Sequence, residues 1–284
     1  MIHVKNLSHS YGNDDVLAVK NISFHVEKGE TFGFLGPSGA GKSTTQNILT
    51  GLLELQQGQV QVAGYDIRKK DPKRFNSIGV SFEQANVYGK LTALENLKYY
   101  ASLFDVPTRD PMELLELVGL RDHAKERAST FSKGMKHRLT FARSMLNNPK
   151  LWFLDEPTTG LDPAIAAVIK DIIRQKKAEG TTVFLTTHNM HIAEELCDRV
   201  AFLVDGEIKL IDTPRNLKLE FGHKVVEVEY QEDGATVRDS FRLSDTSQKA
   251  ALAECISTRD ILTMHSKEAS LEEIFIQVTG KGLD

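Results

Sequence analysis

The chain has 284 residues, of which 40% are hydrophobic and 26% are charged, with a formal net charge of -4 at pH 7 and a pI near 6.2. This composition is ordinary for a soluble globular protein, and a prior of about 150 residues per domain predicts about two domains. A slightly acidic chain lacks the basic footprint of general nucleic-acid binding, so we expect no nucleic-acid partner.

The sequence also lacks membrane and secretion signals. No run approaches the ~18 apolar residues of a membrane span, and Met1 to Asn6 lack the apolar core of a signal peptide. The two cysteines, Cys197 and Cys255, have no metal-type spacing, which favours reduced structural thiols. We therefore expect a cytosolic chain.

The N-terminal region is predicted to form an antiparallel β layer. Apolar and polar residues alternate from Ile2 to Leu7, a turn follows at Tyr11 to Asp14, and the alternation resumes from Val16 to Val26. Residues Gly58 to Gly64 alternate in the same way and join this layer. A period of two is typical of strands with one buried face.

A glycine-rich loop lies between a short strand and a helix. Thr31 to Leu35 is an apolar run typical of a buried strand, and residues 45 to 53 have helical spacing. Glycines let the backbone turn its N–H groups inward around an anion, Lys42 can reach the β- and γ-phosphates, and Ser43 offers a hydroxyl to Mg²⁺. The motif therefore predicts a nucleoside triphosphate site formed by Gly36, Pro37, Ser38, Gly39, Ala40, Gly41, Lys42, Ser43 and Thr44.

The middle of the chain is predicted to be helical. After a strand at Ile78 to Phe82, residues 91 to 147 follow a helical pattern. Thr92 to Glu95 forms a capping box, and Asp110-Pro111 places an N-cap before a proline at the first helical position. This stretch is interpreted as a helical insertion at about residues 85 to 150.

Strands and helices alternate again from residue 151, which implies an α/β fold with a mainly parallel sheet covered by helices. The predicted strands are Leu151 to Asp155, Thr182 to Thr187, Val200 to Val204 and Glu207 to Ile211. Predicted helices run from about Ala164 to Ala178, around Ile192 to Cys197, and onward from Thr213-Pro214.

The order of predicted strands and helices changes beyond about Phe221. Two alternating strands, Lys224 to Tyr230 and Thr236 to Phe241, precede a helix near Ser247 to Cys255 and a final helix capped at Ser270 to Glu273. We therefore predict a main domain over residues 1–220 and a small α+β accessory or regulatory domain over residues 221–284.

Two carboxylates end the apolar strand that starts at Leu151. Asp155, the first, suits a Mg²⁺ ion held together with Ser43. Glu156, the second, suits polarising a water that attacks the γ-phosphate, so it is the candidate catalytic base.

A further motif, Phe131-Ser132-Lys133-Gly134-Met135, precedes a helix. It resembles the signature loop of ATP-binding-cassette (ABC) ATPases, which usually reads Leu-Ser-Gly-Gly-Gln. The resemblance covers roughly residues 1 to 214 and includes several independent motifs in the family's order. It implies a P-loop NTPase core that binds ATP and Mg²⁺.

The resemblance also implies a head-to-tail dimer in which ATP lies between one subunit's phosphate loop and the other subunit's signature loop. Residues 132 to 135 would then act in trans, with Ser132 as an N-cap and Gly134 as a close-approach residue. Lys133 replaces the usual glycine and Met135 the usual glutamine, and similar variants occur in the bacterial exporter branch.

Three other residues match the family pattern singly. Tyr11 occupies the position at which the family has an aromatic ring that stacks on adenine. His188 occupies the position of the family's switch histidine, which contacts the γ-phosphate and orients the water. Asp162 belongs to the loop that crosses the dimer interface.

One match is displaced. In the family, a glutamine that contacts the metal and the water directly follows the strand that here runs from Ile78 to Phe82. Glu83 occupies that position in this sequence, and Gln84 comes one residue later. A carboxylate can also ligate Mg²⁺ but adds negative charge beside the triphosphate. Either Glu83 or Gln84 can fill the role.

Taken together, the motifs resemble the ATPase subunit of an ABC transporter that works as a homodimer or with a similar partner. Because the chain has no spanning segment, the permease must be a separate polypeptide, which would hold the chain on the inner face of the membrane. The signature form and the stretch Ala269 to Phe275 look like ABC-2-type bacterial drug and antibiotic exporters.

Two alternatives remain. A soluble ABC ATPase acting on nucleic acid or ribosomes would share the cassette motifs, but its usual coiled coils or second cassette are not seen. A small-molecule kinase would explain residues 36 to 44 and leave residues 131 to 135 and 159 to 162 unexplained.

Overall fold

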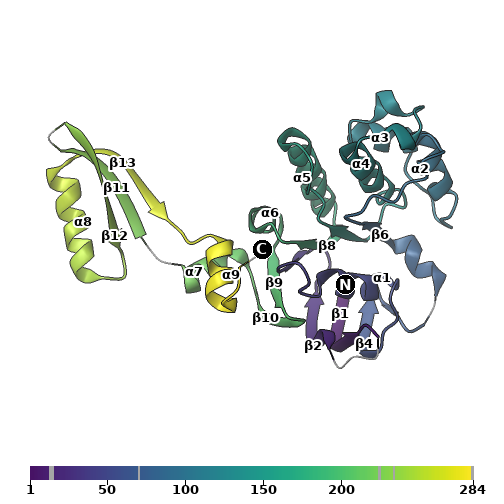
Figure 1. The fold of residues 1–284 in the computed structure, drawn as a ribbon, viewed down its shortest axis with the longest axis horizontal. Coiled ribbons are helices and arrows are strands. Elements are labelled where there is room, and N and C mark those ends of the chain that lie inside the picture. The colour runs from purple at the N-terminus through teal and green to yellow at the C-terminus, as the bar shows by residue number, and fades with distance from the viewer. Residues whose placement is uncertain (13–15, 70, 223–224, 233, 283–284) are drawn as a thin grey trace. The chain divides into compact units, whose positions relative to one another are not determined.

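The computed structural model describes residues 1–12, 16–69, 71–222, 225–232 and 234–282 (Figure 1). Its contacts separate two compact units, Met1–Thr213 and Pro214–Lys281. This division is seven residues before the predicted boundary at 220/221, because helix α7 (Pro214–Phe221) groups with the second unit. The predicted turn residues Asn13 and Asp14 and the predicted strand residue Lys224 lie outside the described residues.

The first unit is built on a six-stranded sheet with the order β10-β9-β3-β8-β7-β6. Its strands run parallel except for β10, which pairs antiparallel with β9. Every residue of β3, β7 and β8 is buried, as expected for parallel strands covered on both faces. The strand bounds are β3 Thr31–Leu35, β6 Ile78–Ser81, β7 Leu151–Asp155, β8 Thr182–Thr187, β9 Arg199–Val204 and β10 Glu207–Asp212.

A four-stranded antiparallel sheet with the order β2-β1-β4-β5 forms the predicted N-terminal layer. Its buried face shares one apolar core with the six-stranded sheet. Phe24 stacks on Phe32 and Phe184 with ring centroids 5.6 and 6.1 Å apart, which joins strands of both sheets. The strand bounds are β1 Ile2–Ser10, β2 Leu17–Val26, β4 Gln57–Val62 and β5 Tyr65–Asp66.

The helices of the first unit cover the six-stranded sheet and form the predicted insertion. Helix α1 ends at Thr50, three residues before the predicted end, because Gly51 takes a left-handed conformation with φ 79°. Helices α2, α3 and α4 gather beyond β6 at one side of the sheet (Figure 1). The helix bounds are α1 Lys42–Thr50, α2 Ala93–Ala101, α3 Pro111–Leu117, α4 Lys133–Arg143, α5 Pro163–Ala178 and α6 Met190–Leu196, with short 3₁₀ helices η1 Pro72–Ser77, η2 Arg121–His123 and η3 Ala128–Thr130.

The helix caps agree with the sequence signals. Thr92 and Glu95 form the predicted capping box of α2. Asp110 accepts a hydrogen bond from the Met112 N–H, with Pro111 at the first helical position of α3. In the part of the chain that the structure describes, no helix is both long and apolar enough to cross a membrane.

The second unit contains a three-stranded antiparallel sheet with the order β12-β11-β13. Strand β13 was not predicted, because this edge strand leaves most of its residues exposed, including Leu262 and Met264, and so lacks the burial pattern of an inner strand. Val226, Val228 and Tyr230 of β11 form a small core with Cys255 of α8. The bounds are β11 Val225–Glu232, β12 Ala235–Arg242, α8 Thr246–Thr258, β13 Asp260–Lys267 and α9 Leu271–Thr279.

Candidate functional site

The glycine-rich loop connects β3 to α1, as predicted. Gly39 and Gly41 have φ angles of 78° and 105°, which side chains rarely adopt. A Cβ atom on Gly36 would lie 2.1 Å from the Leu203 carbonyl oxygen, and one on Gly41 would lie 2.6 Å from the Ala18 carbonyl oxygen. These positions therefore require glycine for backbone shape and for space.

Lys42 begins α1 and is 9% exposed. Its Nζ donates hydrogen bonds to the carbonyl oxygens of Gly36 at 2.6 Å and Pro37 at 2.9 Å, across its own loop. Burial lowers the pKa of this ammonium group, and the nearby carboxylates of Glu156, Asp155 and Glu83 partly oppose the change. The loop cation is thus surrounded by negative groups that the chain itself supplies.

Asp155 ends β7 and lies opposite Thr186 of the parallel strand β8. The Thr186 hydroxyl donates a hydrogen bond to Asp155 Oδ1. Burial raises the pKa of this carboxyl group, while the Thr186 hydrogen bond acts in the opposite direction. Glu156 and Glu83 also raise the pKa of Asp155, so a cation placed here would relieve both the burial and the crowding of negative charge.

Glu156 is 5% exposed and is held by four hydrogen bonds. Oε1 accepts the backbone N–H of His188 at 2.8 Å and lies 2.6 Å from Nδ1 of the same residue. Oε2 accepts the hydroxyls of Thr159 and Thr187, both at 2.9 Å. The two predicted catalytic residues, Glu156 and His188, are therefore in direct contact.

The backbone of Glu156 is strained. Its φ of 47° lies in the left-handed region, which costs a non-glycine residue of order 1–3 kcal/mol. Such strain persists where the surroundings fix a residue, and the four hydrogen bonds do so here. The turn after β7 therefore holds the Glu156 carboxylate in one orientation.

Three threonines at this site were not predicted from the sequence: Thr159, Thr186 and Thr187. Each contacts a predicted carboxylate through its hydroxyl. The signal was present, because Thr186 and Thr187 end a strand parallel to the one that carries Asp155 and Glu156. The carboxyl ends of neighbouring parallel strands meet at one edge of the sheet.

Tyr11 lies beside the start of α1. Its hydroxyl shares a hydrogen bond with the Thr44 hydroxyl at 3.1 Å, and its ring meets His9 edge-on with centroids 5.1 Å apart. The residue is 54% exposed. An exposed ring next to the phosphate loop is compatible with stacking on a base.

The signature residues lie at the start of α4. The Ser132 hydroxyl accepts the Met135 N–H at 3.2 Å, which makes Ser132 the predicted N-cap. Ser132 and Lys133 are exposed, and a Cβ atom on Gly134 would meet only Leu161 at an ordinary 3.7 Å. Within the chain, nothing described demands a glycine at position 134.

The signature residues line a cavity of about 410 Å³ together with the two candidates for the family's glutamine. Glu83 and Gln84 are both exposed and line this cavity with Lys133 and Gly134. The Glu83 charge acts on Lys42 and on Asp155, so Glu83 lies within electrostatic range of the phosphate loop.

Asp162 caps helix α5, where its Oδ1 accepts the Ile165 N–H at 3.0 Å. Helix α4 is tied to the segment after Gln84, because Arg143 Nη1 donates a hydrogen bond to the Asn86 carbonyl oxygen. Among the described residues there is no cluster of three or more His, Cys, Asp or Glu side chains that could hold a metal by itself. The carboxylates of Asp155 and Glu83 lie within electrostatic range of each other, and carboxylate oxygens are ligands that Mg²⁺ prefers.

Comparison with known proteins gives consistent matches. A family model described as "ABC transporter" matches residues 19–159. The chain is 48% identical, over 100% of its length and 94% of the relative, to a fluoroquinolones export ATP-binding protein of Mycobacterium tuberculosis. It is 32% identical, over 100% of its length and 99% of the relative, to a linearmycin resistance ATP-binding protein of Bacillus subtilis.

Solved structures of the same family match about three quarters of the chain. A dimeric ATP-binding cassette bound to ADP and Pi in a post-hydrolysis state superposes with a TM-score of 0.69 at 28% identity, covering 75% of this chain and 98% of the other. An ATP-binding subunit of an ABC transporter superposes with a TM-score of 0.71 at 28% identity, covering 78% and 93%.

Proposed function

The chain belongs to the ATP-binding-cassette transporter family as an ATP-hydrolysing subunit, and from that premise we propose that it powers the export of a drug or antibiotic through separate membrane subunits. The observation that carries the chemistry is the fixed Glu156 carboxylate, held by His188, Thr159 and Thr187 next to Asp155 and the phosphate loop. Relatives that cover the whole chain are named for fluoroquinolone export and linearmycin resistance.

The proposed ATP site uses both ends of the loop. The backbone N–H groups of residues 38 to 44 and the N-terminus of α1 would bind the phosphates, with Lys42 exchanging its carbonyl partners for phosphate oxygens. The Tyr11 ring would stack on adenine. Mg²⁺, which supplies charge neutralisation at the phosphates, would be held by Ser43, Asp155 and either Glu83 or Gln84.

If Glu83 fills the third position, it adds negative charge beside the triphosphate, since the Glu83 charge acts on Lys42 and Asp155. A second carboxylate near the triphosphate is tolerable only while a cation is bound. Binding of ATP without the metal should therefore be weaker than in a cassette with glutamine at this place.

Hydrolysis follows from the position of Glu156. Its carboxylate would accept a proton from a water whose oxygen attacks the γ-phosphorus. The bond from that phosphorus to the bridging oxygen then breaks, and its electron pair leaves with ADP. His188 would hold Glu156 in place and contact the γ-phosphate, since its Nδ1 already lies 2.6 Å from Glu156 Oε1.

The proposed site is completed by a second subunit. Ser132 and Lys133 are exposed at the start of α4, and Gly134 has no steric need for its missing side chain within the chain. A γ-phosphate arriving from a partner subunit would meet this helix start and the extra charge of Lys133. A solved cassette of similar fold is described as dimeric.

The proposed complex lies at the inner face of the membrane, bound to a permease that is another polypeptide. The alternative of a soluble ATPase acting on nucleic acid or ribosomes is not favoured, because relatives over the full length are named as export or resistance proteins.

The function is tested by purification of the tagged chain from detergent-solubilised membranes of the native organism. We expect a multi-span membrane protein to co-purify and the complex to hydrolyse ATP, with hydrolysis lost in Lys42→Ala. Recovery of ribosomes or nucleic acid in place of the membrane protein would refute the transporter assignment.

A further inference from the structure

A buried glutamine lies one turn into α1, beside the end of strand β8. Gln46 is 1% exposed and follows four residues after Lys42, the residue that begins the helix. Its side-chain Oε1 atom lies 3.2 Å from the Thr186 hydroxyl, which in turn contacts Asp155. Nothing in the proposed hydrolysis uses this amide.

The Gln46 amide is costly in this place. Its Nε2 atom is buried and makes no hydrogen bond within the described part of the chain. A buried donor without an acceptor loses its hydrogen bonds to water and gains none in return. Ile48 and Leu49 of the same helix belong to the apolar core. An apolar side chain of the same length would avoid the cost, so packing alone does not account for an amide at position 46.

The Thr186 hydroxyl has more acceptors around it than protons to give. It donates to Asp155 Oδ1, and its oxygen also lies 3.2 Å from Gln46 Oε1 and 3.3 Å from the Leu154 carbonyl oxygen. A hydroxyl carries one proton. Hydrogen bonds to charged acceptors are the stronger ones, so that proton belongs to Asp155. Gln46 Oε1 then faces the Thr186 oxygen with no proton between them.

A half-turn of the Gln46 amide removes both difficulties. The turn exchanges Oε1 and Nε2 and leaves every other heavy atom in place, because the two ends of an amide have nearly the same shape. Nε2 then donates to the Thr186 oxygen, and Thr186 keeps its own proton for Asp155. Successive hydrogen bonds that point in the same direction strengthen one another.

We propose that Gln46 is a positioning residue for Asp155 and that it acts through the Thr186 hydroxyl. The amide donates to Thr186 Oγ1 and so fixes the direction in which this hydroxyl donates. Asp155 Oδ1 is thereby held, while Oδ2 makes no hydrogen bond to the described residues and is the oxygen left for Mg²⁺. This inference rests on the proposed function, which supplies the metal, and it identifies how the chain orients one of its ligands.

The effect should appear in metal affinity and not in the affinity for the nucleotide alone. Hydrogen bonds that orient a metal ligand typically contribute a factor of about 10–100 to metal binding. Because Gln46 acts on Asp155 through a second side chain, we expect the lower end of this range.

Gln46→Met is the first test, because methionine keeps the length of the side chain and removes the amide. The dissociation constant of a fluorescent ATP analogue would be measured on the full chain, once with Mg²⁺ and once with EDTA. We expect the constant to rise about tenfold with Mg²⁺ and less than about twofold with EDTA.

Thr50→Val is the matched control for Gln46→Met. Thr50 is a buried polar residue of the same helix, and its hydroxyl donates to the carbonyl oxygens of Gln46 and Asn47 within α1. The Thr50→Val constants should match those of the wild type under both conditions. No change in Gln46→Met with Mg²⁺, or an equal rise with Mg²⁺ and with EDTA, would overturn the proposal.

A double-mutant cycle tests whether Gln46 acts through Thr186. Thr186→Val should weaken binding with Mg²⁺ on its own, and addition of Gln46→Met should cause little further loss, because the chain of hydrogen bonds is already broken. Thr186→Ser keeps the hydroxyl and should retain most of the wild-type affinity. If the losses in Thr186→Val and Gln46→Met added in full, Gln46 would not act through Thr186, and the proposal would be wrong.

The wild-type chain separates failure of this inference from failure of the proposed function. The proposed metal site requires that Mg²⁺ strengthen binding of the ATP analogue to the wild type. Equal binding with Mg²⁺ and with EDTA in the wild type would contradict the metal site itself. A wild type that responds to Mg²⁺ together with a Gln46→Met variant that responds equally would contradict only the role of Gln46.

Discussion

The two ends of α1 each hold a buried cation, and the two cations have opposite surroundings. Lys42 at the first end bonds two carbonyl oxygens and lies in the field of three carboxylates. Arg74 at the second end has one long hydrogen bond and no ion pair among the described residues. The difference is that carbonyl oxygens and carboxylates surround Lys42, whereas Arg74 lies over the Phe75 ring.

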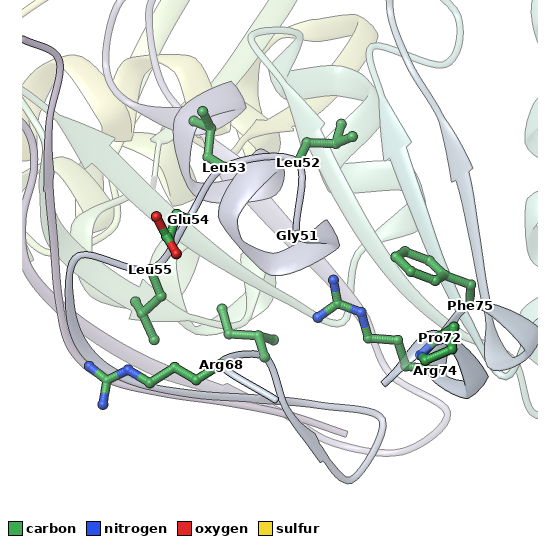
Figure 2. Close-up of a pocket in the computed structure, with 10 residues that line it drawn as sticks. Gly51, Leu52, Leu53, Glu54, Leu55, Arg68, Pro72, Arg74 and Phe75 are labelled. Carbon is green, nitrogen blue, oxygen red and sulfur yellow. The ribbon is translucent and has the colours of Figure 1, made fainter. Parts of the chain in front are cut away.

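The first end is a nearly complete chemical site. Every oxygen of Glu156 is bonded, and Asp155 is held by Thr186. In the proposed mechanism, the nucleotide, Mg²⁺ and a second subunit complete this site. At the second end, Arg74 makes one long hydrogen bond to the Thr50 carbonyl oxygen and places its guanidinium 4.7 Å from the centre of the Phe75 ring (Figure 2).

The largest expected effect is at Glu156. Glu156→Gln keeps the shape of the side chain but cannot accept the proton, so ATP hydrolysis should fall by a factor of about 10²–10⁴ while ATP still binds and traps a dimer. Steady-state phosphate release and light scattering measure both quantities. Glu30→Gln is the control, because Glu30 is a buried carboxylate that directly precedes β3, at the opposite end of that strand from the phosphate loop. Unchanged hydrolysis in Glu156→Gln would exclude Glu156 as the base.

Ser132→Arg tests whether the first end depends on a second subunit. A bulky cation at the start of α4 should block a partner's γ-phosphate, so hydrolysis should be abolished while ATP binding to the monomer is kept. Thr92→Arg removes the N-cap of α2 in the same way and controls for lost helix stability. An equal loss of monomer binding in Ser132→Arg would contradict the trans role.

Thr187→Val tests how the chain orients its own base. The change removes one hydrogen bond to a carboxylate, worth about 1.5–3 kcal/mol, so we expect hydrolysis to fall about tenfold with little change in ATP affinity. Thr182→Val is the matched control, because Thr182 lies at the other end of β8 and bonds the Gly29 N–H. Equal activities in the two variants would show that Thr187 does not position Glu156.

The smallest effect is on stability and comes from Asp155. Because burial raises its pKa in the folded chain, the folded state binds this proton more tightly than the unfolded state does. This group's contribution to stability therefore falls as pH rises through the raised pKa, and the ionised carboxylate is unfavourable at neutral pH. Asp155→Asn should raise the melting temperature of the nucleotide-free chain at pH 7 by a few degrees, because it removes the buried negative charge.

The gain from Asp155→Asn should shrink as the pH is lowered toward the ordinary carboxyl range, where wild-type Asp155 also becomes neutral. Differential scanning calorimetry across pH 4 to 8 measures this dependence. A gain that grew at low pH would show that the Asp155 pKa is depressed and not raised.

The sequence predicts the first end of α1 well and the second end poorly, for a physical reason. Lys42, Asp155 and Glu156 follow fixed local patterns, and strand pairing brings them together. Thr187 and Thr159 were missed because a threonine hydroxyl gains its partner only when neighbouring strands and loops meet.

Arg74 could not be predicted from its neighbours. Arginines are mostly exposed, and only the approach of the Gly51 turn, twenty-three residues earlier, buries this one. The edge strand β13 was missed for a related reason, because pairing on one side alone leaves its pattern weak. Features that depend on contact between distant segments are those that the local pattern does not predict.

One paired measurement tests the central claim that the nucleotide binds at the first end of α1. Lys42→Ala and Arg74→Gln would each be assayed for ATP affinity. The account predicts that Lys42→Ala loses ATP binding, while Arg74→Gln keeps it, because Arg74 lies at the opposite end of the helix from the phosphate loop. If both variants lost ATP binding equally, the two ends of α1 would not differ in function.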